Sequence, residues 1–193
     1  MLTTKIVVIA MLFLLCTSSP DRSEFVLETI HQRTSIRSFT DQAVTEEQLE
    51  TLLRAAMAAP SSRNVQPWVF YVVDDAATLQ HLAKELPFAS MAAGAPVAII
   101  VCGDTRKGQP NEEQAKNWIM DCSAASQNLL LAAHAMGLGA VWTGVFPYRD
   151  RIDVVRERLN IPEHLVPLNL IPIGHPAESP PPKEKWDPGK VIR

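Results

Sequence analysis

The sequence predicts one domain of the α/β or α+β class. Two observations support this: apolar residues make up 47% of the 193 residues, and segments with helical periodicity alternate with short β-branched runs. A chain of this length can bury one hydrophobic core of ordinary size. Helices and strands that alternate along a chain pack as layers around such a core. The charged fraction of 20% is also that of a folded protein rather than a disordered one.

Five segments have the spacing of apolar residues that is typical of helices: residues 21–31, 46–59, 78–86, 114–136 and 150–159. Thr45 is the expected N-cap of the second, and Gln48 three residues later completes a capping-box pattern. The fourth is the longest and is mostly apolar, so we expect it to be central and well buried. Gly137 is its expected C-terminal stop.

Four apolar runs rich in β-branched residues are expected to be strands: Trp68–Val73, Val97–Val101, Gly139–Thr143 and Leu168–Ile173. From residue 176 onward the chain contains the run Pro180-Pro181-Pro182 and no further periodicity. This composition favours an extended arm over a packed helix. An arm of this length on a small domain often wraps around another surface.

Net charge and cysteine usage exclude two classes of function. The formal charge is −3, so the chain has no general positive field that would attract nucleic acid, and any anion site must be local. Cys16, Cys102 and Cys122 are widely separated and lack the spacing of metal ligands. We therefore expect no metal site and no disulfide framework.

Residues 1–20 have the layout of a signal peptide or an N-terminal anchor, and residues 21–193 form the predicted domain. Lys5 precedes an apolar run from Ile6 to Leu15, and small polar residues follow. The run is short for a transmembrane helix. A start codon placed too early, or a helix packed on a partner surface, explains the pattern equally well. The protein is exported or membrane-associated if the segment is a signal, and cytoplasmic otherwise.

A basic segment, Arg33-Thr34-Ser35-Ile36-Arg37, follows the first predicted helix. Its two guanidinium groups and two hydroxyls are the groups that bind phosphate. Exposed charge is the usual state of arginine, however, so a solvated surface is the default interpretation of this segment alone.

Two further segments are rich in polar or glycine residues. The loop from Pro60 to Trp68 contains Asn64 and Gln66, whose amides match the donor and acceptor edge of a flavin pyrimidine or a nucleobase. A simple turn after a helix is the alternative interpretation. Glycines between Gly137 and Gly144 allow a backbone to approach a flat ligand closely. They follow a helix instead of opening one, so the segment is not a dinucleotide fingerprint.

The order of these segments resembles that of the nitroreductase family of FMN-dependent oxidoreductases, from about Phe25 to Lys190. The family pattern has an Arg-x-Ser-x-Arg/Lys segment, a Pro-Ser-Ser-x-Asn-x-Gln-Pro-Trp loop, a Gly-Leu-Gly turn and a Gly-x-Pro element. This chain contains them at 33–37, 60–68, 137–139 and 174–176. The resemblance implies an α+β fold with a central, mostly antiparallel sheet flanked by helices, in an intertwined homodimer with an extended C-terminal arm and FMN at the interface.

The resemblance also implies a cofactor site. Its expected residues are Arg33, Thr34, Ser35, Arg37, Pro60, Ser61, Ser62, Asn64, Gln66, Thr143, Gly144, Lys183 and Lys185. In this scheme Arg33 and Ser35 contact the phosphate and ribityl region, and Arg37 reaches the polar edge of the isoalloxazine. Residues 60–62 come from the partner chain, whereas Thr143 and Gly144 present backbone N–H groups to the flavin N5 side. Lys185, before Lys183, is the first choice for a phosphate contact from the arm.

The implied reaction is a ping-pong transfer of electrons from NAD(P)H through FMN to a nitroaromatic, a quinone or a similar small acceptor. The flavin carries the chemistry, so no residue of the chain needs to be a dedicated catalytic acid or base. A reductive dehalogenase of the iodotyrosine deiodinase type is one alternative. A flavin-binding module without turnover is another.

Overall fold

The computed structural model describes residues 22–108, 111 and 116–193, so the predicted signal or anchor segment at 1–20 lies outside the described residues. The described strands form one sheet in the order β1 (Trp68–Val73), β2 (Val97–Asp104), β5 (Leu165–Gly174) and β3 (Gly139–Ala140). The short strand β4 (Thr143–Gly144) also pairs with β5. Every pair is antiparallel, which confirms the predicted α+β class.

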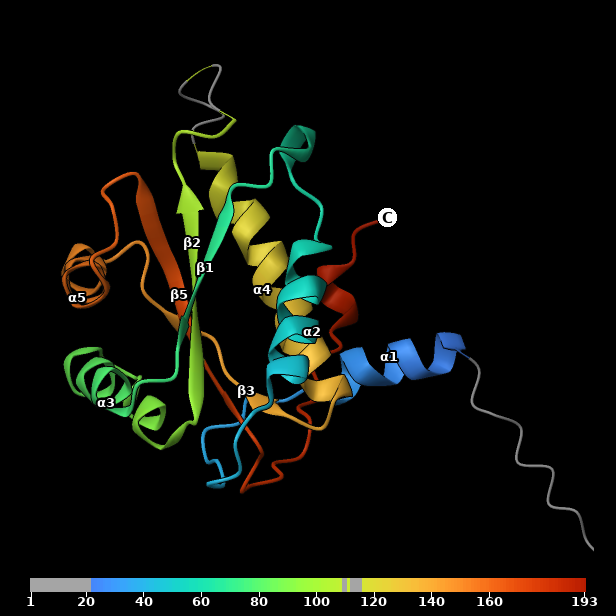
Figure 1. Cartoon of the computed structure of the whole chain (residues 1–193). Coiled ribbons are helices and arrows are strands. Elements are labelled where there is room, and N and C mark those ends of the chain that lie inside the picture. Colours follow the sequence, from blue (N-terminus) through green and yellow to red (C-terminus); the bar gives the residue numbers. More distant parts are fainter. Residues whose placement is uncertain (1–21, 109–110, 112–115) are drawn as a thin grey trace, which may run out of the picture.

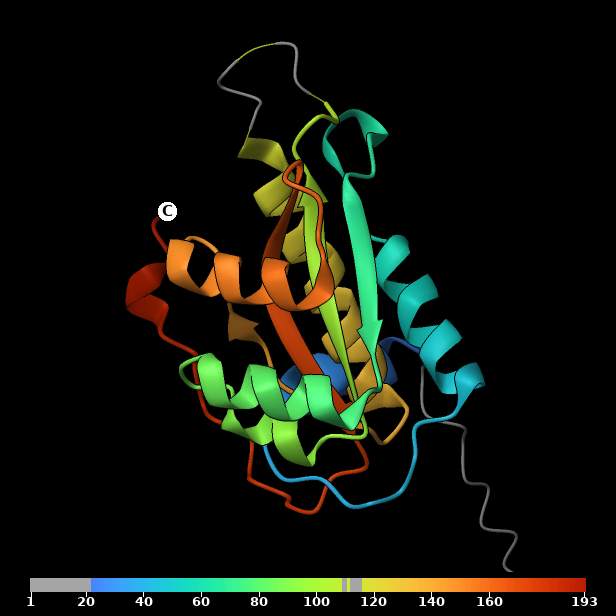
Figure 2. The same cartoon turned by 60° about the vertical axis from the view of Figure 1, so that its left-hand side comes forward.

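The sheet has helices on both faces (Figures 1 and 2). Helices α2 (Glu46–Met57) and α4 (Asn117–Ala135) cover one face, and α3 (Ala76–Glu85) and α5 (Arg149–Leu159) cover the other. Because β2 and β5 are covered on both sides, their residues are buried almost throughout. This explains why both strands have continuous apolar sequences instead of an alternating pattern.

Local signals in the sequence place two helix boundaries correctly. The side chain of Thr45 accepts from the backbone N–H of Gln48 at 3.2 Å, and the Gln48 side chain accepts from the N–H of Thr45 at 2.9 Å. This confirms the predicted capping box at the start of α2. Gly137 follows α4 with a φ of 73°, the left-handed conformation that ends a helix and favours glycine.

The prediction of one continuous strand from Gly139 to Thr143 is wrong. The structure has two strands of two residues each, with Val141 and Trp142 unpaired between them. Since Ala140 pairs with Ile173 and Thr143 with Leu170, Pro172 lies opposite this gap. Proline has no N–H to donate, so the ladder is interrupted there.

Helix α1 (Arg22–Gln32) contacts the C-terminal end of α4, and much of its apolar surface is uncovered within one chain. Four of its apolar side chains are about half exposed: Phe25 at 51%, Val26 at 55%, Leu27 at 55% and Ile30 at 49%. After residue 176 the chain is exposed, with only a short 3₁₀ turn at Pro188–Lys190. Among the described residues, no helix combines the length and the apolar character that crossing a bilayer requires.

Candidate functional site

The basic segment crosses the end of the sheet beside β3. The backbone N–H of Ile36 donates to the carbonyl of Ala140 at 3.1 Å, and the Ile36 side chain is buried. Gly139 makes this approach possible, because a Cβ at that position would lie 2.5 Å from Cγ2 of Ile36. The glycine-rich turn after α4 therefore holds the basic segment in place.

On its other side, the chain that follows the basic segment pairs with the end of β5. The N–H of Thr40 donates to the carbonyl of His175 at 2.9 Å, and the N–H of Ala177 donates to the carbonyl of Ser38 at 2.9 Å. Gly174 permits this contact, since a Cβ there would lie 3.0 Å from the ring of Phe39. The Gly-x-Pro element thus brings the start of the arm against residues 38–40.

These contacts create a cleft of about 460 Å³ between the basic segment and the arm. It is lined by Arg33, Thr34, Ser35, Arg37, Glu178, Pro180, Pro181, Lys183 and Lys185. Four of these side chains are cationic, and in the described part of the chain none of the four forms a salt bridge. Unpaired cations beside hydroxyl groups form a local site for an anion in a chain whose net charge is negative.

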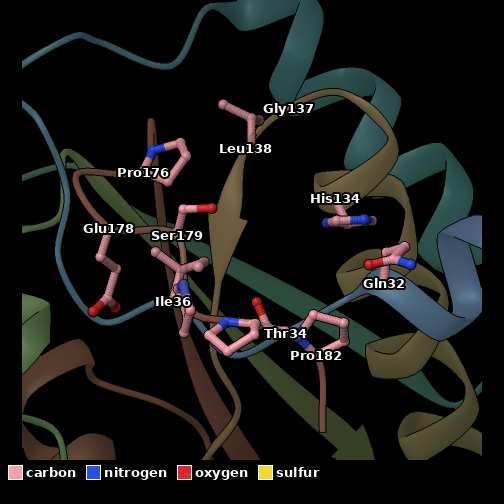
Figure 3. A pocket seen from close by; sticks show the side chains of 12 residues that line it. Gln32, Thr34, Ile36, His134, Gly137, Leu138, Pro176, Glu178, Ser179 and Pro182 are labelled. Atoms are coloured by element: carbon pink, nitrogen blue, oxygen red, sulfur yellow. The ribbon is translucent and has the colours of Figure 1, made fainter.

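A second hollow of about 370 Å³ adjoins this cleft on the side of α4. Figure 3 shows Thr34 and Ile36 near Ser179 and Pro182 of the arm, with His134 of α4 on the far side. The basic segment therefore borders both hollows: Thr34 lines both, whereas Arg33, Ser35 and Arg37 line the cationic cleft.

Glu178 is the one acidic residue lining the cationic cleft, and the sequence did not indicate it. Its carboxylate accepts hydrogen bonds from the backbone N–H groups of Arg37 and Ser38. In the sequence, Glu178 is marked only by its position four residues after Gly174 of the Gly-x-Pro element. Nothing in that spacing shows that the side chain folds back onto a segment about 140 residues earlier.

The loop at 60–66 lies at the N-terminal end of α4. The N–H of Ser62 donates to Asp121 at 3.0 Å, and the Ser62 hydroxyl accepts from the Asn117 amide at 3.1 Å. Within the loop, the Gln66 amide donates to the Asn64 side chain at 3.0 Å. Gln66 therefore braces the loop through Asn64.

One chain does not bring this loop and the basic segment together. The loop is at the N-terminal end of α4, and the basic segment is beside the turn that follows its C-terminal end. The 19 residues of α4 span about 28 Å at a rise of about 1.5 Å per residue. Pro60, Ser61, Ser62, Asn64 and Gln66 are thus about one helix length from the cationic cleft.

Thr143 and Gly144 lie against the middle of β5. The Thr143 hydroxyl donates to the Leu170 carbonyl at 2.6 Å, so this side chain is used within the fold. The Gly144 carbonyl accepts from Arg151 at 3.0 Å, and that guanidinium stacks over Tyr148. Leu170, opposite Thr143, is four residues along β5 from Gly174, which is about 13 Å at the rise of a strand.

The two cysteines of the described residues are buried in the core. Burial raises the pKa of Cys102 and of Cys122 to about 12, so both thiols stay protonated at neutral pH. In the described ranges, no group of three or more His, Cys, Asp or Glu side chains is arranged to hold a metal ion. The fold is thus an antiparallel α+β fold, and it carries a cleft lined by four cationic side chains.

Comparison with known proteins gives the family. The nitroreductase family model matches residues 30–175. A relative from Methanothermobacter thermautotrophicus, provisionally named an NADH dehydrogenase/NAD(P)H nitroreductase, is 46% identical over 86% of this chain and 85% of its own length. An FMN reductase (NADPH) from Bacillus subtilis is 34% identical over 78% of this chain and 66% of its own.

A crystal structure agrees with these matches. A protein from Desulfovibrio desulfuricans, provisionally named a nitroreductase and solved in complex with FMN, is 34% identical to this chain. It has a TM-score of 0.74 and covers 92% of this chain and 98% of its own. The chain belongs to the nitroreductase family, as the order of its motifs indicated.

Proposed function

We propose that this protein is an NAD(P)H-dependent oxidoreductase that uses FMN as its cofactor. The observation that carries the proposal is the cationic cleft. Its four cations, Arg33, Arg37, Lys183 and Lys185, come from the first and last parts of the domain sequence. A cluster of cations with hydroxyl groups is the donor set that a phosphate dianion requires. Membership of the nitroreductase family, and the FMN named for two of the relatives, support FMN as the anion.

In this proposal the residues divide along the length of the cofactor. Arg33, Ser35 and the two arm lysines hold the phosphate end, and Lys185 is the first choice among the lysines. Arg37 lies toward the polar edge of the isoalloxazine, where a positive charge stabilises negative charge on the ring. When bound, FMN supplies the two-electron redox chemistry of the reaction.

The residues near the other end of the cofactor bind through their backbone. The Thr143 side chain is occupied by the Leu170 carbonyl, and β4 pairs with β5, so a backbone N–H at 143–144 that points away from β5 is what this segment offers to the flavin N5 side. Arg151 holds the Gly144 carbonyl and thereby fixes the orientation of this short strand. The distance of about 13 Å along β5 suits a ligand that extends from the basic segment to β4.

We further propose that the complete site forms between two copies of the chain. The loop at 60–66 is about 28 Å from the basic segment of its own chain, so it reaches a cofactor only from a second subunit. The uncovered apolar face of α1 supports a homodimer, because an apolar surface of this kind is stabilised by burial against a partner. The arm, which is exposed in one chain, is a second element available for that interface.

The proposed turnover is ping-pong. NAD(P)H would bind, pass a hydride to the FMN held by these residues and leave as NAD(P)+; a nitroaromatic, quinone or similar small acceptor would then enter the same site and take up the two electrons. None of the steps requires a nucleophile from the chain, because the flavin supplies the chemistry. Protons come from water.

The test is anaerobic addition of NADPH or NADH to FMN-loaded protein while the flavin absorbance band is followed. Rapid bleaching, with recovery on addition of nitrofurazone or menadione, supports the reductase. Persistent colour favours a binding module, and recovery only with an iodotyrosine favours the dehalogenase. A protein that cannot be reconstituted with FMN contradicts all three functions.

The shared site is tested by mixing two inactive variants. Arg33→Ala damages the basic segment, and Asn64→Ala damages the loop of the opposite subunit. A mixed dimer then contains one site with both changes and one with neither, so mixing and refolding equal amounts restores about a quarter of the wild-type sites. Lys84→Ala, an exposed change on α3, is the matched control and keeps full activity when unmixed. Absence of any recovery contradicts a site made by two subunits.

A further inference from the structure

Two neighbouring backbone N–H groups of the chain converge on one carboxylate. The N–H groups of Arg37 and Ser38 both donate to Oε1 of Glu178, the second at 3.1 Å. In the described part of the chain Glu178 takes part in no salt bridge, although it lines the same cleft as four cations. The carboxylate is therefore used to bind the backbone of the basic segment.

These bonds are made at the start of the arm, directly before its proline run. Before Glu178, the arm is tied to residues 38–40 through Ala177 and His175. After it come the three prolines at 180–182, whose fixed φ angles make the chain stiff. A stiff segment transmits the orientation of its first residue to its last. This proline run lies between Glu178 and Lys183, the first of the two arm lysines.

Figure 3 shows Glu178 and Ser179 directed to different sides of the arm, with the Glu178 carboxylate pointing away from His134. Glu178 lines both hollows, whereas Lys183 and Lys185 line the cationic cleft and not the hollow beside α4. Glu178 and the two lysines therefore face the same cleft.

We propose that Glu178 is a positioning residue for the anion site: by fastening the arm to Arg37 and Ser38, it aligns Lys183 and Lys185 with the arginines of the basic segment. This inference rests on the proposed binding of FMN and deepens it. The proposal predicts the direction in which FMN affinity changes when Glu178 is removed. A carboxylate in an anion cleft weakens anion binding by its charge alone, so removal of Glu178 strengthens FMN binding unless its positioning role is the larger effect.

The experiment compares Glu178→Ala and Glu178→Gln with Glu184→Ala. Glu184 is on the same arm and carries the same charge, and it lines a neighbouring hollow with Arg33, Lys183 and Lys185, but its carboxylate accepts from the nearby N–H of Trp186 and makes no hydrogen bond to the basic segment among the described residues. FMN affinity is measured by quenching of flavin fluorescence. Glu178→Ala is expected to bind FMN about tenfold more weakly, as the loss of two charge-assisted hydrogen bonds implies. Glu178→Gln keeps an acceptor oxygen and stays within about threefold of wild type.

Two measurements without cofactor separate this proposal from the proposed function. In Glu178→Ala, amide hydrogen exchange at Arg37 and Ser38 accelerates, and trypsin cuts faster after Lys183 and Lys185 than in wild type or Glu184→Ala. FMN binding by Glu178→Ala that equals or exceeds that of wild type overturns the inference, as do unchanged exchange and cleavage. If the wild-type protein itself fails to bind FMN, the proposed function falls, while exchange and cleavage still decide whether Glu178 fastens the arm.

Discussion

Substitution of Gly139 by alanine tests how tightly the basic segment is seated. The added Cβ would lie 2.5 Å from Cγ2 and 2.7 Å from Cβ of Ile36, closer than side-chain carbon atoms approach in folded proteins. Ile36 is buried, and its N–H is bound to the Ala140 carbonyl, so it moves only by breaking that bond. Overpacking of this kind costs about 2 kcal/mol. For a domain of this size, that lowers Tm by roughly 4–8 °C.

The assay is urea unfolding followed by far-UV circular dichroism, together with FMN titration. Gly94→Ala is the matched control, because nothing lies within 4 Å of a Cβ at that position. Its free energy of unfolding should stay within about 0.5 kcal/mol of wild type. A double variant with Ile36→Ala should be less destabilised than the sum of the two changes, since truncation removes the contacts with Cγ2 and Cγ1 and leaves that with Cβ. Equal stability of Gly139→Ala and Gly94→Ala would refute the argument.

Four further predictions concern Arg37, the two buried thiols and the cap of α2. Arg37→Ala should weaken FMN binding and lower the flavin midpoint potential, and an unchanged potential by spectroelectrochemistry with intact binding would count against the proposed role of this arginine. Because burial raises the pKa of Cys102 and Cys122 to about 12, neither folded thiol should react with iodoacetamide at about pH 8, as measured by peptide mass spectrometry; fast labelling would contradict their burial. The same pKa shift makes folding stability, fully present below the unfolded thiol pKa of about 9, decline as pH rises toward 12, because the unfolded thiols ionise first. Thr45→Ala should lower the free energy of unfolding by about 0.5–2 kcal/mol through loss of the α2 cap, whereas Thr45→Ser should retain most of it; equal losses in a urea titration would refute the capping argument.

Features set by near neighbours in the chain could be predicted from the sequence. The capping box at Thr45 and Gln48 depends on residues three positions apart, and it was correct. The bounds of β1, Trp68–Val73, agree with the predicted strand to the residue, because a proline and a polar loop bound an aromatic, β-branched run. The family also followed from the order of the motifs.

Features set by distant parts of the chain could not be predicted in this way. The interruption between Ala140 and Thr143 depends on Pro172, about thirty residues later, and on the register that places it opposite the gap. The role of Glu178 depends on a contact with Arg37, 141 residues earlier. Neither residue type nor local spacing encodes these long-range contacts. They depend on how β3 pairs with β5.

The cationic cleft is closed by a contact between two parts of the chain that are 141 residues apart. A contact of such high sequence separation carries a large loop-closure entropy, so it forms only after the sheet has brought its ends together. A ligand that binds there gains nothing from a partly folded chain, and its binding free energy stabilises the native state as a whole. Release of the ligand on heating should therefore coincide with the unfolding of the sheet. A mutation anywhere in the core that lowers the melting temperature should lower the temperature of ligand release by the same amount.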